Sequence, residues 1–485
     1  MRTKKTLCLL LALPLLLFAC QNPGSGGTTE TSDQGGDIAD HENSEPTENP
    51  LYIDALPERD FGGYLFNMLT WPYIYANTEL VVEEQTGDTI PDAIYLANKT
   101  LEDRFNVNFK QLYAPDTNQI VTYVKKAVNS GDNAYDAALI VDRDALGLAM
   151  SGKFFYNVNE LPHVDLDRLY WDQELKKALT IDNVLYFAYG AHNLSVYGNV
   201  NFLVYNKAIA TELGLENMYD LVRGGKWTVD KLYEMAAAAV KDLDGDGKMT
   251  KNDRWGVALF TGWYYPSFWM GEKIPLVAKD ENDLPYFNVP GNEALFNLFE
   301  KLYAHTAKGF DYIRNEDFRE VFDNGLSLFM ASTMYDVQRL RAMETDYGIL
   351  PYPRMSEAKP GEPYVGRLAG GFPLIVPVTA DAERASVVLE ALACEYQRRV
   401  IPNYYEVAVQ VKSTRDEESI EILDMLMKNR FLDFGDCLWT WDIRVKYTDI
   451  FEFQTNNFQS VTEKITGSVE KMIEKAIAVF REANG

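Results

Sequence analysis

An alternation of strand and helix patterns between residues 64 and 141 is the strongest constraint on how this chain can fold. Three apolar runs rich in aromatic residues predict strands, and two segments with apolar residues at helical spacing predict helices between them. In chain order the predicted strands and helices are 64–71, 89–106, 106–113, 117–131 and 135–141. Because such units join parallel strands by right-handed crossovers, we expect a parallel sheet covered by helices.

A second α/β pattern follows this first one. Residues 200–214 run from a strand pattern into a helix pattern, and Thr228 is placed to cap the helix that begins after it. The further predicted helices are 229–241, 292–305, 335–343, 383–400 and 468–482, and the further predicted strands are 255–260 and 325–332. More than 400 residues are too many for one core, so two large domains are expected.

The N-terminus predicts an export signal. Positive charges at Arg2, Lys4 and Lys5 precede an apolar run from Leu7 to Phe18, which is too short to span a bilayer that needs about 20 residues. The sequence Leu-Phe-Ala-Cys ending at Cys20 resembles the lipobox of bacterial lipoproteins, in which the cysteine carries the lipid anchor. An ordinary signal peptide with a chance cysteine is the alternative. We therefore predict a signal peptide at 1–19.

Residues 20–50 are rich in Gly, Ser, Thr, Pro and acids and hold almost no large apolar side chain. Such a segment buries no core and should be a disordered tether. No second long apolar stretch follows, so the rest of the chain is expected outside the cytoplasm and anchored to the membrane through Cys20 alone.

The net charge of the chain argues against two classes of binding partner. The formal net charge of −26 repels nucleic acid and anionic lipid headgroups, although it serves solubility as well and says little about the ligand.

Beyond the predicted lipid-bearing residue, Cys394 and Cys437 are the cysteines of the mature chain. They could form one disulfide or remain two buried thiols, and the second alternative is favoured.

The segment DLDGDGKMTKND at 242–253 has the residue spacing of an EF-hand calcium loop. A helix pattern precedes it, but a strand pattern follows, so a sensor that changes an angle between two helices is disfavoured. We predict one structural Ca²⁺ that joins the helix to the strand, with an Asp/Gly turn without metal as the alternative. The predicted ligands are Asp242, Asp244, Asp246, the carbonyl of Lys248, Thr250 and Asp253, which is shorter than the usual Glu.

Catalytic motifs are missing from the sequence. It has four histidines, widely spaced, and no HExxH, GxSxG, paired CxxC or Gly-rich phosphate loop. A glycosidase that uses two carboxylates leaves no short motif and stays possible. Aromatic density stands out instead, because WYYPSFW at 263–269 holds five aromatic residues around Pro266. We expect a loop there, whose rings either stack on sugar faces or pack in the core, with at least one ring exposed.

Several segments in order resemble the extracellular solute-binding proteins of ABC importers, most closely the sugar-binding family 1. They are LEDRFNVNF, YDAALIVDRDALGLAMSGKFFYNVNEL, VNFLVYNKAIATELG, GKWTVDKL leading into DLDGDGK, EVFDNGLSLFM, and DYGILPYPR followed by YVGRLAGGFPLIVP. The resemblance covers nearly all of the mature chain. It implies an α/β, two-lobed, periplasmic-binding-protein-like fold of type II, with the ligand cleft between lobes that close about a hinge.

The resemblance also implies where the chain passes between lobes: near Tyr197–Val200, near Leu368–Phe372 and near residues 412–418. Lobe 1 would then comprise 51–197 and 371–415, and lobe 2 would comprise 198–370 and 416–485. The implied cleft residues are Trp71, Tyr73, Asp142, Arg143, Asn199, Trp263, Tyr265, Trp269, Tyr335 and Gly370. Asp142 and Arg143 would hydrogen-bond hydroxyl groups, and the aromatic rings would stack on sugar faces.

These patterns together predict a membrane-anchored, extracytoplasmic, monomeric binding protein. It would deliver a sugar or oligosaccharide to the transmembrane subunits of an ABC permease and perform no bond chemistry. Binding proteins of the resembling family often have Trp where this chain has Tyr335, and an acid where it has Asn199. The identity of the sugar is therefore open. The alternative function is a secreted surface glycosidase or another carbohydrate-active enzyme.

Overall fold

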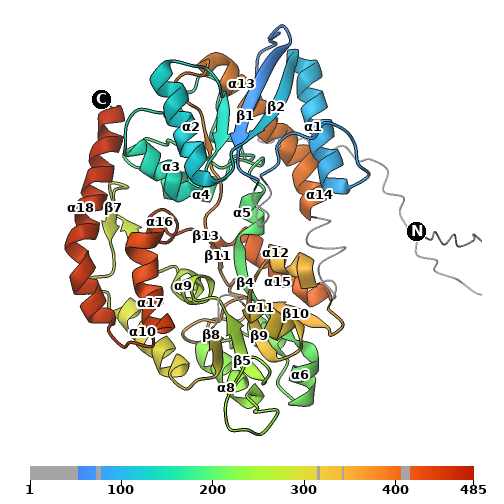
Figure 1. Cartoon of the computed structure of the whole chain (residues 1–485), viewed down its shortest axis with the longest axis vertical. Helices are drawn as coiled ribbons and strands as arrows, with labels where there is room; N and C mark the ends of the chain where they lie inside the picture. Colours follow the sequence, from blue (N-terminus) through green and yellow to red (C-terminus); the bar gives the residue numbers. More distant parts are fainter. Residues whose placement is uncertain (1–52, 73–77, 314–316, 341–342, 406–415, 485) are drawn as a thin grey trace, which may run out of the picture. The chain divides into compact units, whose positions relative to one another are not determined.

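The computed structural model describes residues 53–72, 78–313, 317–340, 343–405 and 416–484 of the chain (Figure 1). The predicted signal peptide, the predicted lipidation site Cys20, the predicted tether and Tyr73 lie outside these residues, as does most of the third predicted crossing. No helix in the described ranges is long and apolar enough to cross a membrane.

The first sheet has four strands in the order β12-β3-β1-β2. Strand β1 pairs in parallel with both β2 and β3, so the predicted parallel arrangement of these three strands is confirmed. Strand β12 comes from a distant part of the sequence and adds to the β3 edge in antiparallel orientation. The bounds are β1 Tyr64–Thr70, β2 Val107–Tyr113, β3 Ala137–Leu139 and β12 Leu374–Ile375.

Helices next to these strands follow local sequence signals. Helix α2 begins after Asp116, whose carboxylate accepts a hydrogen bond from the Gln119 amide at 2.9 Å, and it ends at Gly131, whose φ of +68° suits glycine. A 3₁₀ turn covers Val158–Glu160, and a π-helical turn at Tyr396–Val400 joins α13 to α14. The helix bounds are α1 Thr89–Phe105, α2 Thr117–Ser130, α3 Asp142–Ala149, α4 Gln173–Leu179, α5 Ser195–Gly198, α13 Ala382–Glu395 and α14 Ile401–Tyr405.

The second sheet has seven strands and is mixed rather than parallel. Its order is β13-β11-β4-β9-β5-β8, and β10 also pairs with β4. Strand β5 runs parallel to β8 and β9, whereas β4 is antiparallel to β9, β10 and β11. All seven residues of β4 are buried, as expected for a strand covered on both faces. The bounds are β4 Val200–Asn206, β5 Trp255–Leu259, β8 Asp311–Ile313, β9 Ser327–Thr333, β10 Tyr347–Leu350, β11 Gly366–Leu368 and β13 Arg430–Phe431.

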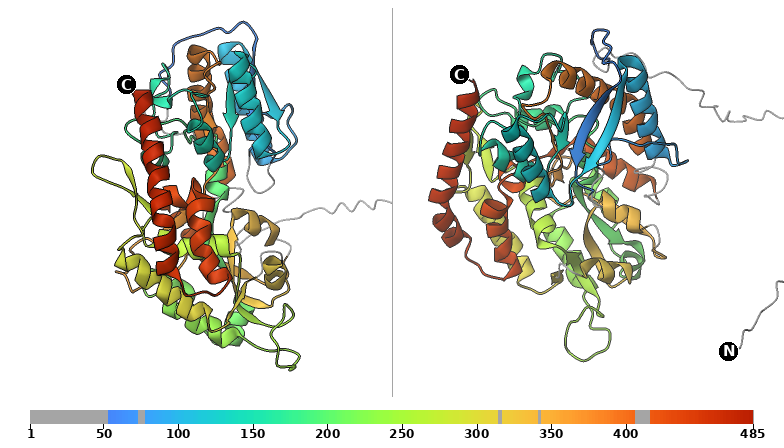
Figure 2. Two further views of the ribbon diagram at one scale, coloured as in Figure 1. Left: turned by 60° about the vertical axis from the view of Figure 1, so that its left-hand side comes forward. Right: turned by 45° about the horizontal axis from the view of Figure 1, so that its top comes forward.

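The remaining helices belong to the second half of the chain. Helix α18 begins ten residues before the helix predicted at 468–482 and lies beside α17 and β7 in both views of Figure 2. Strands β6 Val277–Lys279 and β7 Pro285–Phe287 form a separate hairpin. The helix bounds are α6 Lys207–Glu212, α7 Met218–Arg223, α8 Val229–Ala239, α9 Thr261–Gly271, α10 Glu293–Thr306, α11 Phe318–Asp323, α12 Met334–Arg339, α15 Glu417–Lys428, α16 Phe434–Cys437, α17 Val445–Glu452 and α18 Phe458–Asn484.

The prediction of a loop at 263–269 was wrong, because the WYYPSFW segment forms part of helix α9. Pro266 inside a helix costs about 3 kcal/mol through its missing N–H and its ring clash. Four rings of α9 are fully buried, and each large apolar side chain contributes roughly 1.5–3 kcal/mol on burial. The packing term therefore exceeds the proline penalty. The buried rings belong to Tyr264, Tyr265, Phe268 and Trp269.

The chain enters the second sheet at Val200 and leaves it after Leu368 to reach β12 at Leu374 in the first sheet. Two short connections therefore join the elements of the two sheets in this part of the chain. The exact lobe boundaries stay a prediction. Cys394 and Cys437 are buried and are not joined in a disulfide, which agrees with the favoured alternative of two buried thiols.

Candidate functional site

A cavity of about 430 Å³ is lined by residues that follow strands of the first sheet and by residues in or next to strands of the second. This volume lies within the roughly 300–1,000 Å³ of typical small-molecule sites. Five of the ten predicted cleft residues line it, and Figure 1 shows the strands β1 and β4 and helix α9 that carry or precede several of them. These five are Trp71, Asp142, Arg143, Asn199 and Trp263.

Strand ends explain why these residues converge. Trp71 follows the last residue of β1, and Asp142 opens α3 shortly after β3, so both lie at the carboxyl edge of parallel strands. Ligands of α/β sheets bind beyond this edge. Asn199 immediately precedes β4, and Trp263 lies in the first turn of α9 after β5. The cavity thus collects termini of elements that are far apart in the sequence.

Asp142 ties the first sheet to the connection after β11. Its side chain is 4% exposed, and its two oxygens accept hydrogen bonds from the backbone amides of Arg143 at 2.8 Å and Gly371 at 3.1 Å. Burial raises the pKa of Asp142 to about 7, against the opposing effect of these two amides. A carboxylate has about four acceptor positions, so Asp142 keeps capacity for a ligand hydroxyl group.

Gly370 does not line the cavity, but its lack of a side chain leaves room for the Asp142 carboxylate, which does. Its φ is +84°, and a Cβ atom at this position would lie 2.2 Å from Asp142 Oδ2. Asn199 Nδ2 also donates a hydrogen bond to the Gly370 carbonyl at 3.1 Å. Glycine at this position therefore lets the connection approach the Asp142 carboxylate closely.

Arg367 and Asp436 form a buried ion pair next to Asn201 and Arg444, two residues that line the cavity. Arg367 is fully buried, and its Nε and Nη2 atoms lie 2.9 and 2.7 Å from Asp436 Oδ2. Its Nη1 donates to the side-chain oxygen of Asn201, which lines the cavity. On the other side of Asp436, Arg444 Nε lies 3.7 Å from Oδ1, and Arg444 also lines the cavity. One carboxylate thus lies between two guanidinium groups.

The aromatic part of the cavity has three tryptophans. Trp71 packs against Phe372 with ring centroids 6.2 Å apart, and Trp263 packs edge-on against Phe260 at 5.2 Å. The Arg319 guanidinium lies 5.0 Å from the centroid of the Trp263 ring and supports it. Trp441 is 65% exposed and presents the largest free ring surface. Exposed rings of this kind suit stacking on the apolar face of a sugar ring.

Sequence reasoning missed the segment that carries Trp441. It contributes Cys437, Thr440, Trp441 and Arg444, of which the last three belong to a π-helical turn at Thr440–Arg444. Such turns are frequent at functional sites. The available signal was the cluster LWTWDIR at 438–444, in which two tryptophans alternate with polar residues. Phe260, Asn201 and Thr333 were also missed.

Three predicted residues that the structure describes have other surroundings. Tyr265 stacks on Phe451 at 3.8 Å and Trp269 stacks on Phe299 at 5.2 Å, and both rings are fully buried in the core. Because α9 is a helix, its aromatic residues point in several directions, and Trp263 is the one that lines the cavity. Tyr335 is half-buried in the first turn of α12 and does not line the cavity.

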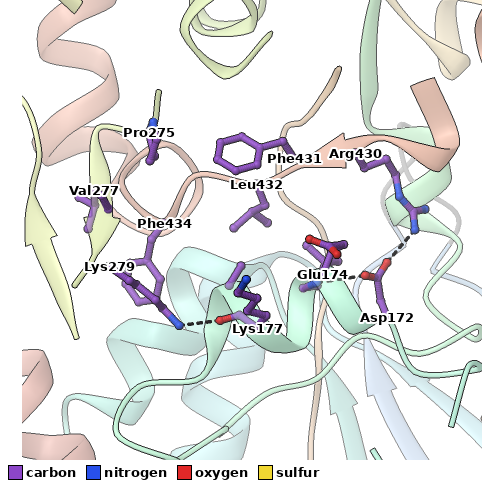
Figure 3. A pocket seen from close by; sticks show the side chains of 13 residues that line it. Asp172, Glu174, Lys177, Pro275, Val277, Lys279, Arg430, Phe431, Leu432 and Phe434 are labelled. Carbon is purple, nitrogen blue, oxygen red and sulfur yellow. Dashed lines mark hydrogen bonds and ion pairs between the residues drawn. The ribbon is translucent and has the colours of Figure 1, made fainter. Parts of the chain in front are cut away.

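A second cavity of about 220 Å³ has mainly apolar walls (Figure 3). Val277, Phe431 and Phe434 surround it, and α4 closes it from the other side. Two polar contacts flank it: Arg430 Nη2 lies 2.7 Å from Asp172 Oδ2, and Lys279 Nζ donates to the Lys177 carbonyl at 2.5 Å. These contacts join segments that were predicted for different lobes, so this cavity belongs to the packing between them.

The predicted calcium loop is closed by paired backbone hydrogen bonds of 2.9 Å between Lys241 and Arg254. Carboxylate oxygens of Asp242, Asp244 and Asp246 lie within 4.8 Å of one another. Gly247 has a φ of +78°, as the sharp turn at position 6 requires. Three converging carboxylates are a donor set that fits Ca²⁺, which prefers oxygen ligands.

The other predicted metal ligands make internal contacts. Asp253 is buried, its Oδ1 accepts from the Leu243 amide at 2.9 Å, and its Oδ2 accepts from the Thr250 amide at 2.7 Å and hydroxyl at 3.0 Å. These backbone bonds lower the pKa of Asp253. The Lys248 amide donates to Asp246 Oδ1 at 2.7 Å. Strand β5 follows the loop, as the sequence predicted.

No protein-family profile matches this chain, and no curated protein matches it. Solved structures do. UgpB from Mycobacterium tuberculosis, solved in complex with glycerophosphocholine, has a TM-score of 0.58 at 14% identity, covering 85% of this chain and 99% of that chain. The cyclic α-maltosyl-1,6-maltose binding protein from Arthrobacter globiformis has a TM-score of 0.54 at 14% identity, covering 87% and 100%.

A family 1 extracellular solute-binding protein from Bifidobacterium longum subsp. infantis has a TM-score of 0.52 at 12% identity, covering 87% of this chain and 100% of that chain. Each of these solved chains is covered almost completely, so the similarity concerns the whole architecture. The predicted fold class is thereby confirmed: this chain has the two-lobed α/β fold of the family 1 extracellular solute-binding proteins.

Proposed function

We propose that this protein binds a saccharide outside the cytoplasm and delivers it to an ABC permease. The observation that carries the proposal is the 430 Å³ cavity, to which segments next to both sheets contribute aromatic rings and polar side chains. Sugars offer an apolar ring face and a rim of hydroxyl groups, and a site for them needs both kinds of partner. The solved structures with this fold include proteins that bind cyclic maltosyl-maltose and glycerophosphocholine.

In this proposal Trp71, Trp263 and Trp441 stack on sugar rings, while Asp142 and Asn199 exchange hydrogen bonds with hydroxyl groups. The two lobes close about the connections at 197–200 and 368–374. Ligand bound between two lobes favours the closed state by its higher affinity for that state. Lipidation of Cys20 would hold the protein at the membrane near its permease partner.

The number of carboxyl groups that line the cavity favours a binding role over the alternative glycosidase. Glycosidases commonly use two carboxyl groups on either side of the scissile bond. Among the described residues, Asp142 is the one carboxylate that lines the cavity, and both of its oxygens accept backbone hydrogen bonds. We therefore propose that the protein catalyses no reaction.

We also propose that the loop at 242–253 holds a structural Ca²⁺. Asp242, Asp244 and Asp246 would be its carboxylate ligands, and the ion would neutralise their mutual repulsion. The loop follows α8 and precedes β5, and its residues do not line the cavity. Calcium is therefore expected to stabilise the fold without contacting the ligand.

A thermal-shift screen over a carbohydrate panel tests the proposed function. A ligand that binds the native state alone stabilises it by RT ln(1 + [L]/Kd), about 2.7 kcal/mol at 100 Kd. At least one saccharide should raise the melting temperature in proportion to the logarithm of its concentration. The same sample, incubated and analysed by chromatography, should return the saccharide intact. Cleavage products would favour the glycosidase instead.

A further inference from the structure

Two arginines that line the cavity have unused hydrogen-bonding capacity. Arg143 and Arg444 both face the 430 Å³ space, and their side chains make no hydrogen bond to any residue that the structure describes. A guanidinium group carries five N–H donors in a planar fork and no acceptor. The side chain of Arg143 is 35% exposed and that of Arg444 is 17% exposed, so both remain open to a ligand.

The carboxylates near these arginines are already engaged. Asp436 lies 3.7 Å from Arg444, but its Oδ2 accepts from Arg367. Asp144 lies 3.8 Å from Arg143 Nε, and its Oδ2 accepts from the Thr117 hydroxyl. Both distances exceed that of a hydrogen bond, so neither carboxylate satisfies the N–H groups of the nearby arginine.

Asp142 is the one carboxyl group among the described residues that line the cavity, and it forms no ion pair with either arginine. Its oxygens accept from the amides of Arg143 and Gly371, and burial raises its pKa to about 7, so it is partly protonated at neutral pH. Among the described residues, two guanidinium groups and one carboxyl group therefore line the cavity. This local excess contrasts with the formal net charge of −26 for the whole chain.

Leaving the N–H groups of a partly desolvated guanidinium without hydrogen-bond acceptors is unfavourable, and an oxyanion with two adjacent oxygens matches the guanidinium fork best. We propose that the saccharide is anionic, and that its carboxylate or sulfate group binds Arg143 and Arg444 while its rings contact the tryptophans. This inference rests on the proposed function and specifies the substrate class for the same cavity.

Matched saccharides test this proposal by calorimetry and thermal shift. The panel contains galacturonic acid trisaccharide and its fully methyl-esterified form, hyaluronan tetrasaccharide, sulfated chondroitin tetrasaccharide, and neutral maltose and galactan oligomers. We expect an acidic member to bind at least tenfold more tightly than the neutral members, and its affinity to fall as salt is raised. A uronate that binds without sulfate identifies the anion as a carboxylate, whereas binding of the sulfated member alone identifies a sulfate ester.

Arginine variants separate a direct contact from a general charge effect. Arg143→Gln and Arg444→Gln should each lower affinity for the acidic saccharide at least tenfold. Arg223→Gln removes the same charge from an exposed ion pair with Glu421 on α7 and α15, and it should leave affinity unchanged. If Arg444→Gln fails to fold, Arg143→Gln alone tests the proposal, because the side chain of Arg143 is more exposed than that of Arg444.

The outcomes separate the two proposals. Tight binding of a neutral saccharide with no acidic binder overturns the anionic assignment and leaves the binding function intact. Equal loss of affinity in the Arg223 control also overturns it, because the effect would then be one of overall charge. Binding of no saccharide in either screen overturns the proposed function together with this inference.

Discussion

The substitution Gly370→Ala probes the contact on which the geometry of the cavity depends. Gly370 has a φ of +84°, and an added Cβ would lie 2.2 Å from Asp142 Oδ2. The left-handed backbone costs a non-glycine residue roughly 1–2 kcal/mol. Asp142 must also move, and losing its hydrogen bond from the Gly371 amide costs about 1–2 kcal/mol more. We expect a loss of about 3 kcal/mol in the free energy of unfolding.

Gly361→Ala is the matched control, because Gly361 has a φ of +76° but an added Cβ there would meet no other side chain or backbone atom within 4 Å. It should lose only the backbone term of roughly 1–2 kcal/mol. Urea unfolding measures both variants, and calorimetry should show weaker saccharide binding for Gly370→Ala alone. Equal stabilities for the two variants, together with parental affinity in Gly370→Ala, would refute the role assigned to the Asp142–Gly371 contact.

The remaining predictions concern stacking, metal, anchoring and pH. Trp441→Ala should weaken saccharide binding by about 1–3 kcal/mol, measured by calorimetry, at an unchanged melting temperature. Trp269→Ala, at a buried position, should lower the free energy of unfolding by about 3–5 kcal/mol, measured by urea unfolding. A loss of stability in Trp441→Ala and a loss of binding alone in Trp269→Ala would contradict both predictions. A calcium chelator should lower the melting temperature of the parent but not of Asp244→Ala, and equal shifts would exclude the loop as the site. Cys20→Ala should move the protein from the membrane to the soluble fraction, so unchanged membrane association would exclude lipid anchoring at this residue. Burial raises the pKa of Asp311 to about 7, so the free energy of unfolding should fall as pH rises from about 4 to about 7. The free energy of unfolding of Asp311→Asn should exceed that of the parent by on the order of 1–3 kcal/mol at pH 8 but not at pH 4. A constant difference across pH would contradict this prediction.

Elements with strong local signals were predictable from the sequence. Helix α2 has an Asp cap and a terminal glycine, and α8 has its predicted cap, in which the Thr228 hydroxyl accepts from the Lys231 amide at 3.3 Å. The strands of the first sheet were predictable because apolar periodicity is a local property of the chain. The mixed pairing of the second sheet was not, since antiparallel partners such as β10 and β11 are set by contacts between distant segments.

Helix α9 shows where local rules fail. Pro266 disfavours a helix locally, but the burial of Tyr265 against Phe451 and of Trp269 against Phe299 outweighs that preference. The same tertiary packing decides which aromatic residues reach the cavity. Trp263 lines it, whereas Tyr265 and Trp269 belong to the core.

The candidate site was predictable where strand ends mark it. Trp71 and Asp142 follow strands of the first sheet, and their place at the cavity follows from the parallel topology. Trp441 and Arg444 reach the same cavity from a π-helical turn between α16 and α17. No strand end marks that segment, so only the folded chain brings it to the site.

Titration calorimetry with the saccharide found by screening tests the central claim most directly. We predict one binding site per chain, with the ligand recovered unchanged and its affinity reduced at least fivefold in Trp71→Ala and in Trp441→Ala, which line the cavity from opposite ends of the sequence. Saccharide binding of parental strength in both variants would contradict the claim that this cavity is the ligand site.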